Sequence, residues 1–419
     1  MKHALFVAFH YPPEASSSGV LRTLKYSRYL ADYGWRVTVL TLHPDAYQIV
    51  DDNLLKQIPD TVRVVRTSYL NTKRNLSLWG RYPAILAVPD TWIGWLPWAV
   101  AAGRRVMQED PVDLIFSTSP HATAHMIARS LSKSSGAPWV TDFRDPWYEE
   151  PPEPGTPAIV HWFARRLERK VIAKASHVVT STTQLRDMLQ QRYAGQPPNK
   201  FTAILNGYDE ADFSALPVNQ TQRNERMMIV HAGNINAEFR DPRPMFRAVR
   251  KAADRGEIDP SKLCFRFIGG GEFGESAEMS QCVAECGLAQ SVEFLPRVPY
   301  EASLAELANA DALLLLQASD DTAGLVPAKL YEYLRAQRPV LALVFPGATT
   351  DVLATTGGGW AVDPRNANEM EQSLSGAFRA WESNTLAQHC ANLDTLRQYD
   401  RRSLTGKLAQ IFDDLQARE

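Results

Sequence analysis

The chain has few of the features that mark secreted, membrane-spanning or nucleic-acid-binding proteins. Its four cysteines, Cys264, Cys282, Cys286 and Cys390, are too few and too irregularly spaced for a disulfide framework. Cys282 and Cys286 are one helical turn apart, with no nearby histidine or second cysteine pair to complete a zinc site. No apolar run reaches the roughly 18 residues that span a bilayer. A formal net charge of −2 gives no reason to expect a nucleic acid as partner.

The N-terminus also lacks the pattern of a secretory signal. Its apolar run, Ala4 to Phe9, is too short for a signal peptide and ends near a pair of prolines, so it predicts a buried parallel strand. We therefore expect a cytoplasmic protein with reduced thiols. A chain of 419 residues, 45% of them hydrophobic and 22% charged, is typical of a globular protein with two domains of about 200 residues each.

The first half opens on a strand, a loop, a helix and a second strand. After strand 4–9 comes a loop of small residues, 16–19, and then a helix whose apolar side chains recur with helical spacing as far as Gly34. Residues 35–40 restart as a strand. This unit is typical of the start of a doubly wound α/β domain. Further strands are predicted at Val62–Val65, Leu114–Phe116, Trp139–Asp142 and His177–Thr180.

The second half repeats this order. Strand Met227–Ala232 turns at Gly233 and enters a helix at about residues 242–252. The polar segment 206–226, which carries Pro217, is predicted to link a first domain, 1–205, to a second, 227–385. Residues 386–419 are expected to form helices that cross back to the first domain. Further strands are predicted at Leu263–Ile268, Val292–Leu295, Ala312–Leu316 and Val340–Val344.

Residues 66–108 break this pattern. The segment carries Trp79, Trp92, Trp95 and Trp98 among several arginines and lysines. Tryptophan beside basic residues can lie at a membrane interface, and the alternative is that these rings pack a long insertion onto the first domain. Both interpretations stay open.

The segment Gly324–Leu343 places a cation and a carboxylate on one helix. Lys329 and Glu332 are three residues apart at the start of an amphipathic helix that leads into the apolar strand 340–344. Near a helix N-terminus, such an ammonium suits a phosphate, and the carboxylate suits a sugar hydroxyl. The alternative is an exposed helix pair that contributes only about 0.3 kcal/mol to stability.

Several segments, in this order and spacing, resemble the family 4 glycosyltransferases, which are retaining enzymes of GT-B fold. The resemblance implies two facing Rossmann-like domains with parallel sheets and a cleft between them. The second domain would hold most of the nucleotide-sugar donor, and the first would hold the acceptor. The segments are PPEASSSGVLRTLKYSRYLADYGWRVTVLT, DFRDPW, ILNGYD, HAGNINAEFRDPRP, FIGGGEF and PAKLYEYLRAQRPVL.

The resemblance assigns cations to the donor diphosphate. Gly233 allows close approach of the backbone, and Arg240 stands where the family carries a phosphate-binding arginine or lysine. The residue after this glycine is often a second cation in the family, and here it is Asn234, which can cap or donate a hydrogen bond. Arg240 and Lys329 are therefore the expected cationic pair, since charge builds on a departing diphosphate. The alternative for Arg240 is a solvated arginine at a helix end.

Glu332 matches the second acid of the family's E-x7-E motif, which receives the ribose hydroxyls of the nucleotide. The first acid is replaced by Gly324, and Asp320 and Asp321 do not have the right spacing to substitute for it. This departure puts recognition of the donor sugar in question more than nucleotide binding.

Other donor contacts follow from the resemblance. The turn at Gly271 is expected to lie beside the donor, and the turn that holds Arg297 and Val298 is expected to meet the base. In the first domain, Gly19 would face the diphosphate or the acceptor.

The resemblance places catalytic and acceptor residues in the first domain. His121 matches a histidine that faces the donor sugar and orients its hydroxyls. Asp142, Arg144 and Asp145 follow a predicted strand, where open α/β sheets bind ligands. They are expected to touch the acceptor, or else to form an internal network of ion pairs.

Taken together, the resemblance predicts a retaining transferase that moves a sugar from a UDP- or GDP-sugar to a polysaccharide or lipid-linked glycan. The predicted catalytic residues are His121, Arg240, Lys329 and Glu332. No carboxylate is placed as a nucleophile, so front-face retention without metal or cofactor is expected. The alternatives are a nucleotide-sugar epimerase or hydrolase of the same fold, and a non-catalytic partner subunit that binds the nucleotide sugar. Peripheral contact with the inner membrane is a separate hypothesis.

Overall fold

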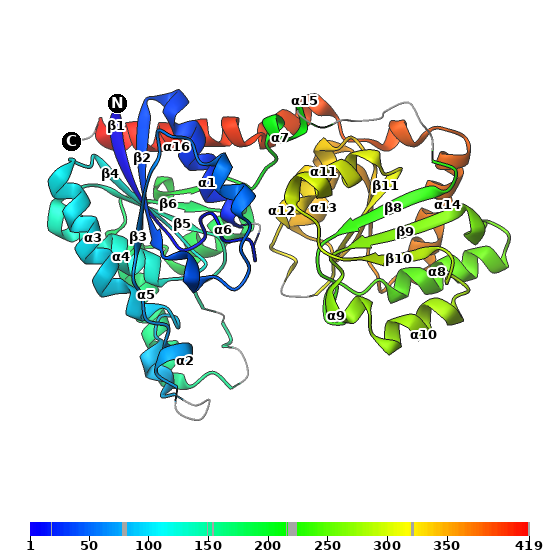
Figure 1. Ribbon diagram of the computed structural model, residues 1–419, viewed down its shortest axis with the longest axis horizontal. Coiled ribbons are helices and arrows are strands. Elements are labelled where there is room, and N and C mark those ends of the chain that lie inside the picture. The colour runs from blue at the N-terminus through cyan, green and yellow to red at the C-terminus, as the bar shows by residue number, and fades with distance from the viewer. Residues whose placement is uncertain are drawn as a thin grey trace. The chain divides into compact units, whose positions relative to one another are not determined.

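The computed structural model describes residues 1–17, 19–77, 82–148, 150–152, 155–214, 216, 224–319 and 322–417. The chain divides into two compact units. Unit 1 comprises residues 1–206 and 401–419, and unit 2 comprises residues 207–400. Each is an α/β unit built on a wholly parallel sheet (Figure 1), which confirms the predicted fold class of two Rossmann-like domains.

The sheet of unit 1 has the order β3-β2-β1-β4-β5-β6-β7, which is the doubly wound order with one added strand. All its predicted strands are present, and β7 is an addition that the sequence pattern missed because it is only three residues long. The strands are β1 Lys2–Ala8, β2 Trp35–Leu42, β3 Arg63–Thr67, β4 Leu114–Thr118, β5 Trp139–Phe143, β6 His177–Thr180 and β7 Phe201–Ala203.

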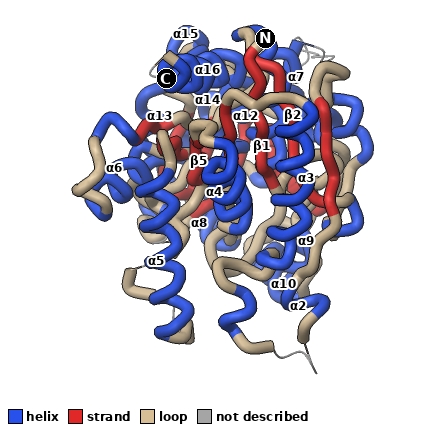
Figure 2. The backbone as a smooth tube through the Cα atoms, turned by 90° about the vertical axis from the view of Figure 1, so that its left-hand side faces the viewer, coloured by secondary structure: helices blue, strands red, loops and turns tan. Residues whose placement is uncertain are grey.

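Helices cover both faces of this sheet because successive strand side chains point to opposite faces. In β1, Leu5 and Val7 face one apolar core, and Ala4 and Phe6 face another. Helices α3, α4 and α5 lie in front of the strands in Figure 2. The helices of unit 1 are α1 Gly19–Tyr29, α2 Thr72–Asn75, α3 Leu96–Glu109, α4 Thr123–Ser135, α5 Ala158–Lys174, α6 Thr183–Arg192 and α16 Arg401–Gln416.

The sheet of unit 2 repeats the same winding, with the order β10-β9-β8-β11-β12-β13. Its strands are β8 Met227–Ala232, β9 Leu263–Ile268, β10 Val292–Leu295, β11 Ala312–Gln317, β12 Val340–Val344 and β13 Gly359–Val362. Its helices are α7 Glu210–Ser214, α8 Arg243–Asp254, α9 Gly271–Gly274, α10 Ala277–Glu285, α11 Tyr300–Asn309, α12 Ala328–Arg335, α13 Ala348–Thr356, α14 Ala367–Glu382 and α15 Leu393–Leu396.

The division between the units differs from the predicted linker 206–226 and C-terminal segment 386–419. Residues 207–214 and 386–400 both belong to unit 2, where the backbone N–H of Tyr208 donates to the carbonyl of Tyr399 at 3.1 Å. Only α16 returns to unit 1. It buries Leu408 and Phe412 in the core beside α1, so apolar packing decides where this helix belongs.

Part of the Trp-rich segment 66–108 packs into unit 1, and part of it is exposed. Trp95 is fully buried, and its indole Nε1 donates to Thr67 Oγ1 at 2.7 Å. Trp92 packs against the same core, whereas Trp98 is 39% exposed. Trp79 lies outside the described residues. Among the helices in the described part of the chain, none is both long and apolar enough to cross a bilayer.

Candidate functional site

In unit 2, the predicted donor residues gather at the carboxyl end of β8. This strand and β11 flank the point where the winding of the sheet reverses, and open α/β sheets bind ligands there. Gly233 follows β8 with a φ of 120°, a conformation that favours glycine. A Cβ added at Gly233 would lie 2.6 Å from Lys329 Nζ, so the missing side chain makes room for this cation.

Lys329 stands in the first turn of α12, which begins after Pro327. Its Nζ donates to the carbonyl oxygen of Ala232 at 2.7 Å. Burial of the ammonium, together with the nearby charge of Arg240, lowers the pKa of Lys329 to about 7. An anion bound here would restore the charged form.

Arg240 completes the cationic pair of unit 2. Burial lowers the pKa of its guanidinium, which lies 4.8 Å from the ring centroid of Phe239. Asn236 holds the Arg240 backbone: its side-chain oxygen accepts from the Arg240 N–H at 3.2 Å, and its own N–H donates to the Arg240 carbonyl. Two cations with lowered pKa values beside a glycine turn form a site that favours an anion.

The neighbouring turns contain the other predicted donor residues, Asn234, Gly271, Arg297 and Val298. Asn234 places its side-chain oxygen against Gly271, where any added Cβ would collide with it. Gly271 opens α9 with a φ of 72°. The Arg297 backbone packs beside Gly269, its side chain is exposed, and Val298 is half-buried. The structure thus brings Gly233, Asn234, Gly271, Arg240 and Lys329 together.

Glu332 lies one turn beyond Lys329 on α12 and is 9% exposed. Tyr300, at the start of α11, donates its hydroxyl to Glu332 Oε1 at 2.9 Å. The same hydroxyl lies 3.2 Å from Asp212 Oδ2 on α7. Glu332 is therefore held in an internal network and is not an exposed helix pair.

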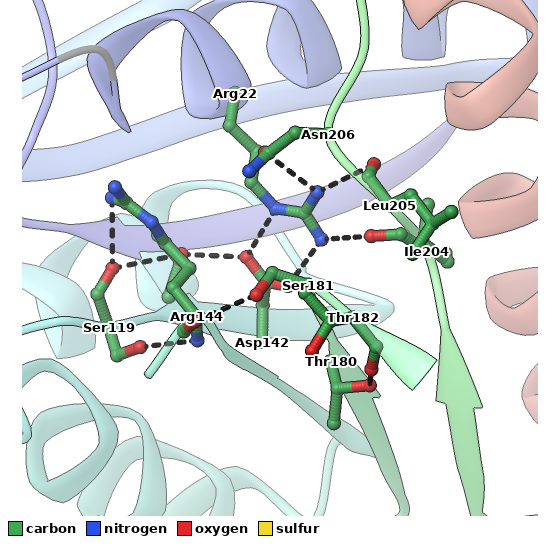
Figure 3. Close-up of polar contacts among 11 residues, drawn as sticks. Arg22, Ser119, Asp142, Arg144, Thr180, Ser181, Thr182, Ile204, Leu205 and Asn206 are labelled. Atoms are coloured by element: carbon green, nitrogen blue, oxygen red, sulfur yellow. Dashed lines mark hydrogen bonds and ion pairs between the residues drawn. The ribbon is translucent and has the colours of Figure 1, made fainter. Parts of the chain in front are cut away.

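In unit 1, Asp142 forms a buried ion pair with Arg22, a residue outside the Asp142, Arg144 and Asp145 cluster for which an internal network was the alternative (Figure 3). Arg22 donates to it twice, from Nη2 to Oδ1 at 2.7 Å and from Nε to Oδ2 at 3.0 Å. Thr118 Oγ1 also donates to Oδ2, at 2.8 Å. Since Asp142 has no exposed surface, direct contact with an acceptor does not fit its position.

The same arginine holds the end of unit 1. Arg22 Nη2 donates to the Ile204 carbonyl at 2.8 Å, and Nη1 donates to the Leu205 carbonyl at 3.0 Å (Figure 3). Arg22 Nη1 also lies 3.4 Å from Asn206 Oδ1. This arginine therefore ties α1 to β5 and to the last residues before unit 2.

Arg144 and Asp145 follow β5. The Arg144 guanidinium lies against Gly19, where a side chain would collide with it, and Nη1 donates to the Ser119 carbonyl at 3.3 Å. Burial lowers the pKa of Arg144. The Asp145 side chain is exposed. The structure thus brings Gly19 and Arg144 together at the carboxyl edge of the sheet.

His121 lies between β4 and α4, among aromatic rings. Its ring centroid is 4.1 Å from that of Phe9 and 6.0 Å from that of Trp92. Burial lowers the pKa of His121 to about 3, and the charges of His10 and Arg144 act in the same direction. His121 is therefore a neutral imidazole, suited to hydrogen bonding with hydroxyls and unsuited to acting as a cation.

Arg22 and Tyr300 are site residues that the sequence analysis did not single out. Local pattern offered no signal for Arg22, because it is two residues from both Val20 and Leu24 and therefore falls on another side of the first helix. Tyr300 had no such signal either, since its partners Asp212 and Glu332 are distant in sequence.

Comparison with known proteins agrees with this fold. Residues 19–207 match the family described as glycosyl transferase 4-like domain. No curated protein matches the sequence. A glycosyltransferase from Rickettsia africae is 13% identical, with a TM-score of 0.69 over 99% of this chain and 98% of that one. HepE from Anabaena, solved with UDP and glucose, is 17% identical, with a TM-score of 0.64 over 99% of this chain and 100% of that one.

A third solved structure, sucrose-phosphate synthase from Thermosynechococcus elongatus, is 15% identical, with a TM-score of 0.63 over 100% of both chains. At such identities the structures establish the fold alone, and the family match concerns residues 19–207. Residues 19–207 thus match a glycosyl transferase 4-like domain, and the chain has the GT-B fold of these solved glycosyltransferases.

Proposed function

We propose that this glycosyltransferase moves a sugar from a UDP- or GDP-sugar, with retention and without metal, to a polysaccharide or lipid-linked glycan. The observation that carries the proposal is the pairing of Lys329 and Arg240 beside Gly233. HepE, a protein of the same fold, was solved with UDP and with UDP-glucose, which supports a nucleotide sugar as donor.

Lys329 and Arg240 would hold the diphosphate. As the glycosidic bond to the diphosphate breaks, negative charge builds on the leaving oxygens, and two preorganised cations stabilise it. The acceptor hydroxyl would attack from the same face of the sugar. The leaving phosphate would take the hydroxyl proton, so no protein carboxylate is needed as a nucleophile.

Glu332 would accept the ribose hydroxyls, oriented by Tyr300. His121, as a neutral imidazole, would orient sugar hydroxyls, and Arg144 and Asp145 would contact the acceptor. Gly19, Asn234, Gly271, Arg297 and Val298 would line the donor. Asp142 takes no direct part in this proposal, because it is buried against Arg22.

The experiment that tests the function is calorimetric binding of UDP, GDP, ADP and CMP without metal, followed by a turnover assay with the matching nucleotide sugars and a lipid-linked glycan fraction. We expect UDP or GDP to bind, and a product to form that Lys329→Met abolishes. Sugar release or isomerisation without acceptor would instead indicate a hydrolase or an epimerase. Binding without any turnover would indicate a non-catalytic partner subunit.

A further inference from the structure

Helix α5 carries an apolar face that unit 1 does not cover. Among its 17 residues, only Glu168, Val171 and Ile172 are buried. Ile159 and Trp162, in its first two turns, are 54% and 51% exposed. A helix of a globular protein normally buries its apolar stripe against the core. The first half of α5 therefore presents an apolar surface.

Two further segments add to this surface. The 3-10 helix η4 (Ala84–Ala87) contacts both α5 and α2. Ile85 and Leu86 of η4 are 44% and 45% exposed, and Leu76, directly after α2, is 48% exposed. In Figures 1 and 2, α2 and the lower part of α5 lie at the same end of unit 1.

We name these five residues, Leu76, Ile85, Leu86, Ile159 and Trp162, the apolar tip. Single exposed apolar side chains are ordinary on a protein surface. Five of them, on segments connected by the contacts of η4 with α2 and α5, indicate an interaction surface.

The rest of α5 is basic. Arg165, Arg166, Arg169, Lys170 and Lys174 are all unburied. The only acid of the helix, Glu168, is fully buried; it accepts from Arg192 at 3.1 Å and from Tyr193 at 2.6 Å, and so adds no charge to the surface.

The exposed positive charge on α5 indicates what kind of partner this surface binds. The Arg166 guanidinium lies 5.5 Å from the Trp162 ring centroid, so cation and apolar ring stand together. Arg165 is the least available cation, because it pairs with Glu150 at 3.2 Å. A helix with exposed tryptophan and isoleucine beside a row of arginines and lysines matches an anionic lipid surface, which takes up rings at its interface and attracts the cations.

We propose that the apolar tip and the basic side of α5 dock unit 1 on an anionic lipid bilayer. Docking would bring the enzyme to a lipid-linked acceptor, and this part of the proposal rests on the proposed function. The proposal replaces Trp92 and Trp95 as membrane contacts, since those rings pack in the core.

The test is co-sedimentation of the full chain with vesicles of phosphatidylglycerol and phosphatidylcholine, and with vesicles of phosphatidylcholine alone. We expect binding to the anionic vesicles that falls with added salt. Ile159→Ser with Trp162→Ser, and separately Arg166→Glu with Arg169→Glu, should each lower the partition coefficient at least tenfold. All four side chains are exposed, so these variants should fold. The matched control is Leu55→Ser with Leu393→Ser, which changes exposed apolar residues elsewhere and should bind like the wild type.

The proposal is overturned if the wild-type chain stays in the supernatant, or if the apolar and charge variants bind as well as the wild type. It is also overturned if the wild type is a dimer that Ile159→Ser with Trp162→Ser converts to a monomer without any lipid binding. That result would make the tip an interface between two copies of the chain. Nucleotide binding by the same preparations separates the two hypotheses. Lipid binding without binding of either UDP or GDP contradicts the proposed function alone, and binding of UDP or GDP without lipid binding contradicts docking alone.

Discussion

Lys329 Nζ lies 2.7 Å from the carbonyl oxygen of Ala232, to which it donates a hydrogen bond. The bond joins the first turn of α12 to the end of β8. It holds a cation beside the glycine turn at Gly233. The cation is held by a neutral partner, so its charge remains available to an anion.

The first prediction concerns the two cations. Lys329→Met and Arg240→Met should each weaken UDP or GDP binding by about 1.5–3 kcal/mol, because each removes a charged donor to the diphosphate. Calorimetry measures the loss, and circular dichroism checks that each variant is folded. Arg250→Met, at an exposed arginine on α8, is the matched control and should bind normally. Unchanged affinity in both site variants would contradict the assignment.

The second prediction follows from the pKa of Lys329, which burial lowers to about 7. At pH 8 most of the free protein has a neutral Lys329, and a bound diphosphate favours the charged form. Binding should therefore take up a proton above pH 7, and the affinity should fall as the pH rises from 7 to 9. Calorimetry at pH 8 in two buffers of different ionisation enthalpy measures the uptake. Equal enthalpies in the two buffers would show that Lys329 does not titrate on binding.

The third prediction concerns Gly233. An alanine there would meet Lys329 Nζ and would have to adopt a φ of 120°, which is strained for any residue with a side chain. Gly233→Ala should destabilise unit 2 by about 1–3 kcal/mol and weaken nucleotide binding. Gly376→Ala is the control, because its site in α14 is open and glycine inside a helix is unfavourable. Urea unfolding measures the stability of the Gly233→Ala and Gly376→Ala variants. A Gly233→Ala variant as stable as the wild type would exclude backbone strain at this position.

The fourth prediction concerns Tyr300. Tyr300→Phe removes the hydroxyl that donates to Glu332 and should weaken ribonucleotide binding by about 1 kcal/mol. The same substitution should weaken binding of the 2′-deoxynucleotide by less, because the deoxyribose makes fewer hydrogen bonds to Glu332. A merely structural role would weaken both ligands equally. The ratio of the UDP and 2′-deoxy-UDP affinities therefore decides between a positioning role and a structural one.

The fifth prediction concerns the buried ion pair. Arg22→Met leaves the Asp142 carboxylate buried with Thr118 as its remaining donor and should destabilise the protein by about 3–5 kcal/mol. Asp142→Leu should lower the stability by a similar amount. The double variant should lose clearly less than the sum of the two, since no charge is left unpaired. Additive losses in urea unfolding would show that the two residues act independently.

Much of the fold follows from local pattern. The apolar runs of β1, β2, β8 and β12 indicate buried parallel strands, because a strand with helices on both faces is apolar along most of its length. The glycine turn at Gly34, a left-handed helix end, was equally visible. The short strands β7 and β13 were missed, since β7 has only three residues and β13 begins in a run of three glycines, which indicates a turn.

The candidate site was visible only in part. Lys329 and Glu332 share one helix, so helical periodicity brings them together without any knowledge of the tertiary fold. The interpretation of Asp142 depended on Arg22, which is 120 residues away along the chain. Local sequence cannot show such a contact, because the winding of the sheet creates it.

The sequence by itself determined the α/β class, most strands and the placement of Lys329 and Glu332 on one helix, because these depend on residues close together in the chain. Only the tertiary structure decided that Asp142 is an internal partner of Arg22, that Tyr300 orients Glu332, and that α16 belongs to unit 1. It also decided that Trp95 is buried while Trp162 is exposed. The physical reason is the same in each case: burial and ion pairing depend on which distant segments pack together.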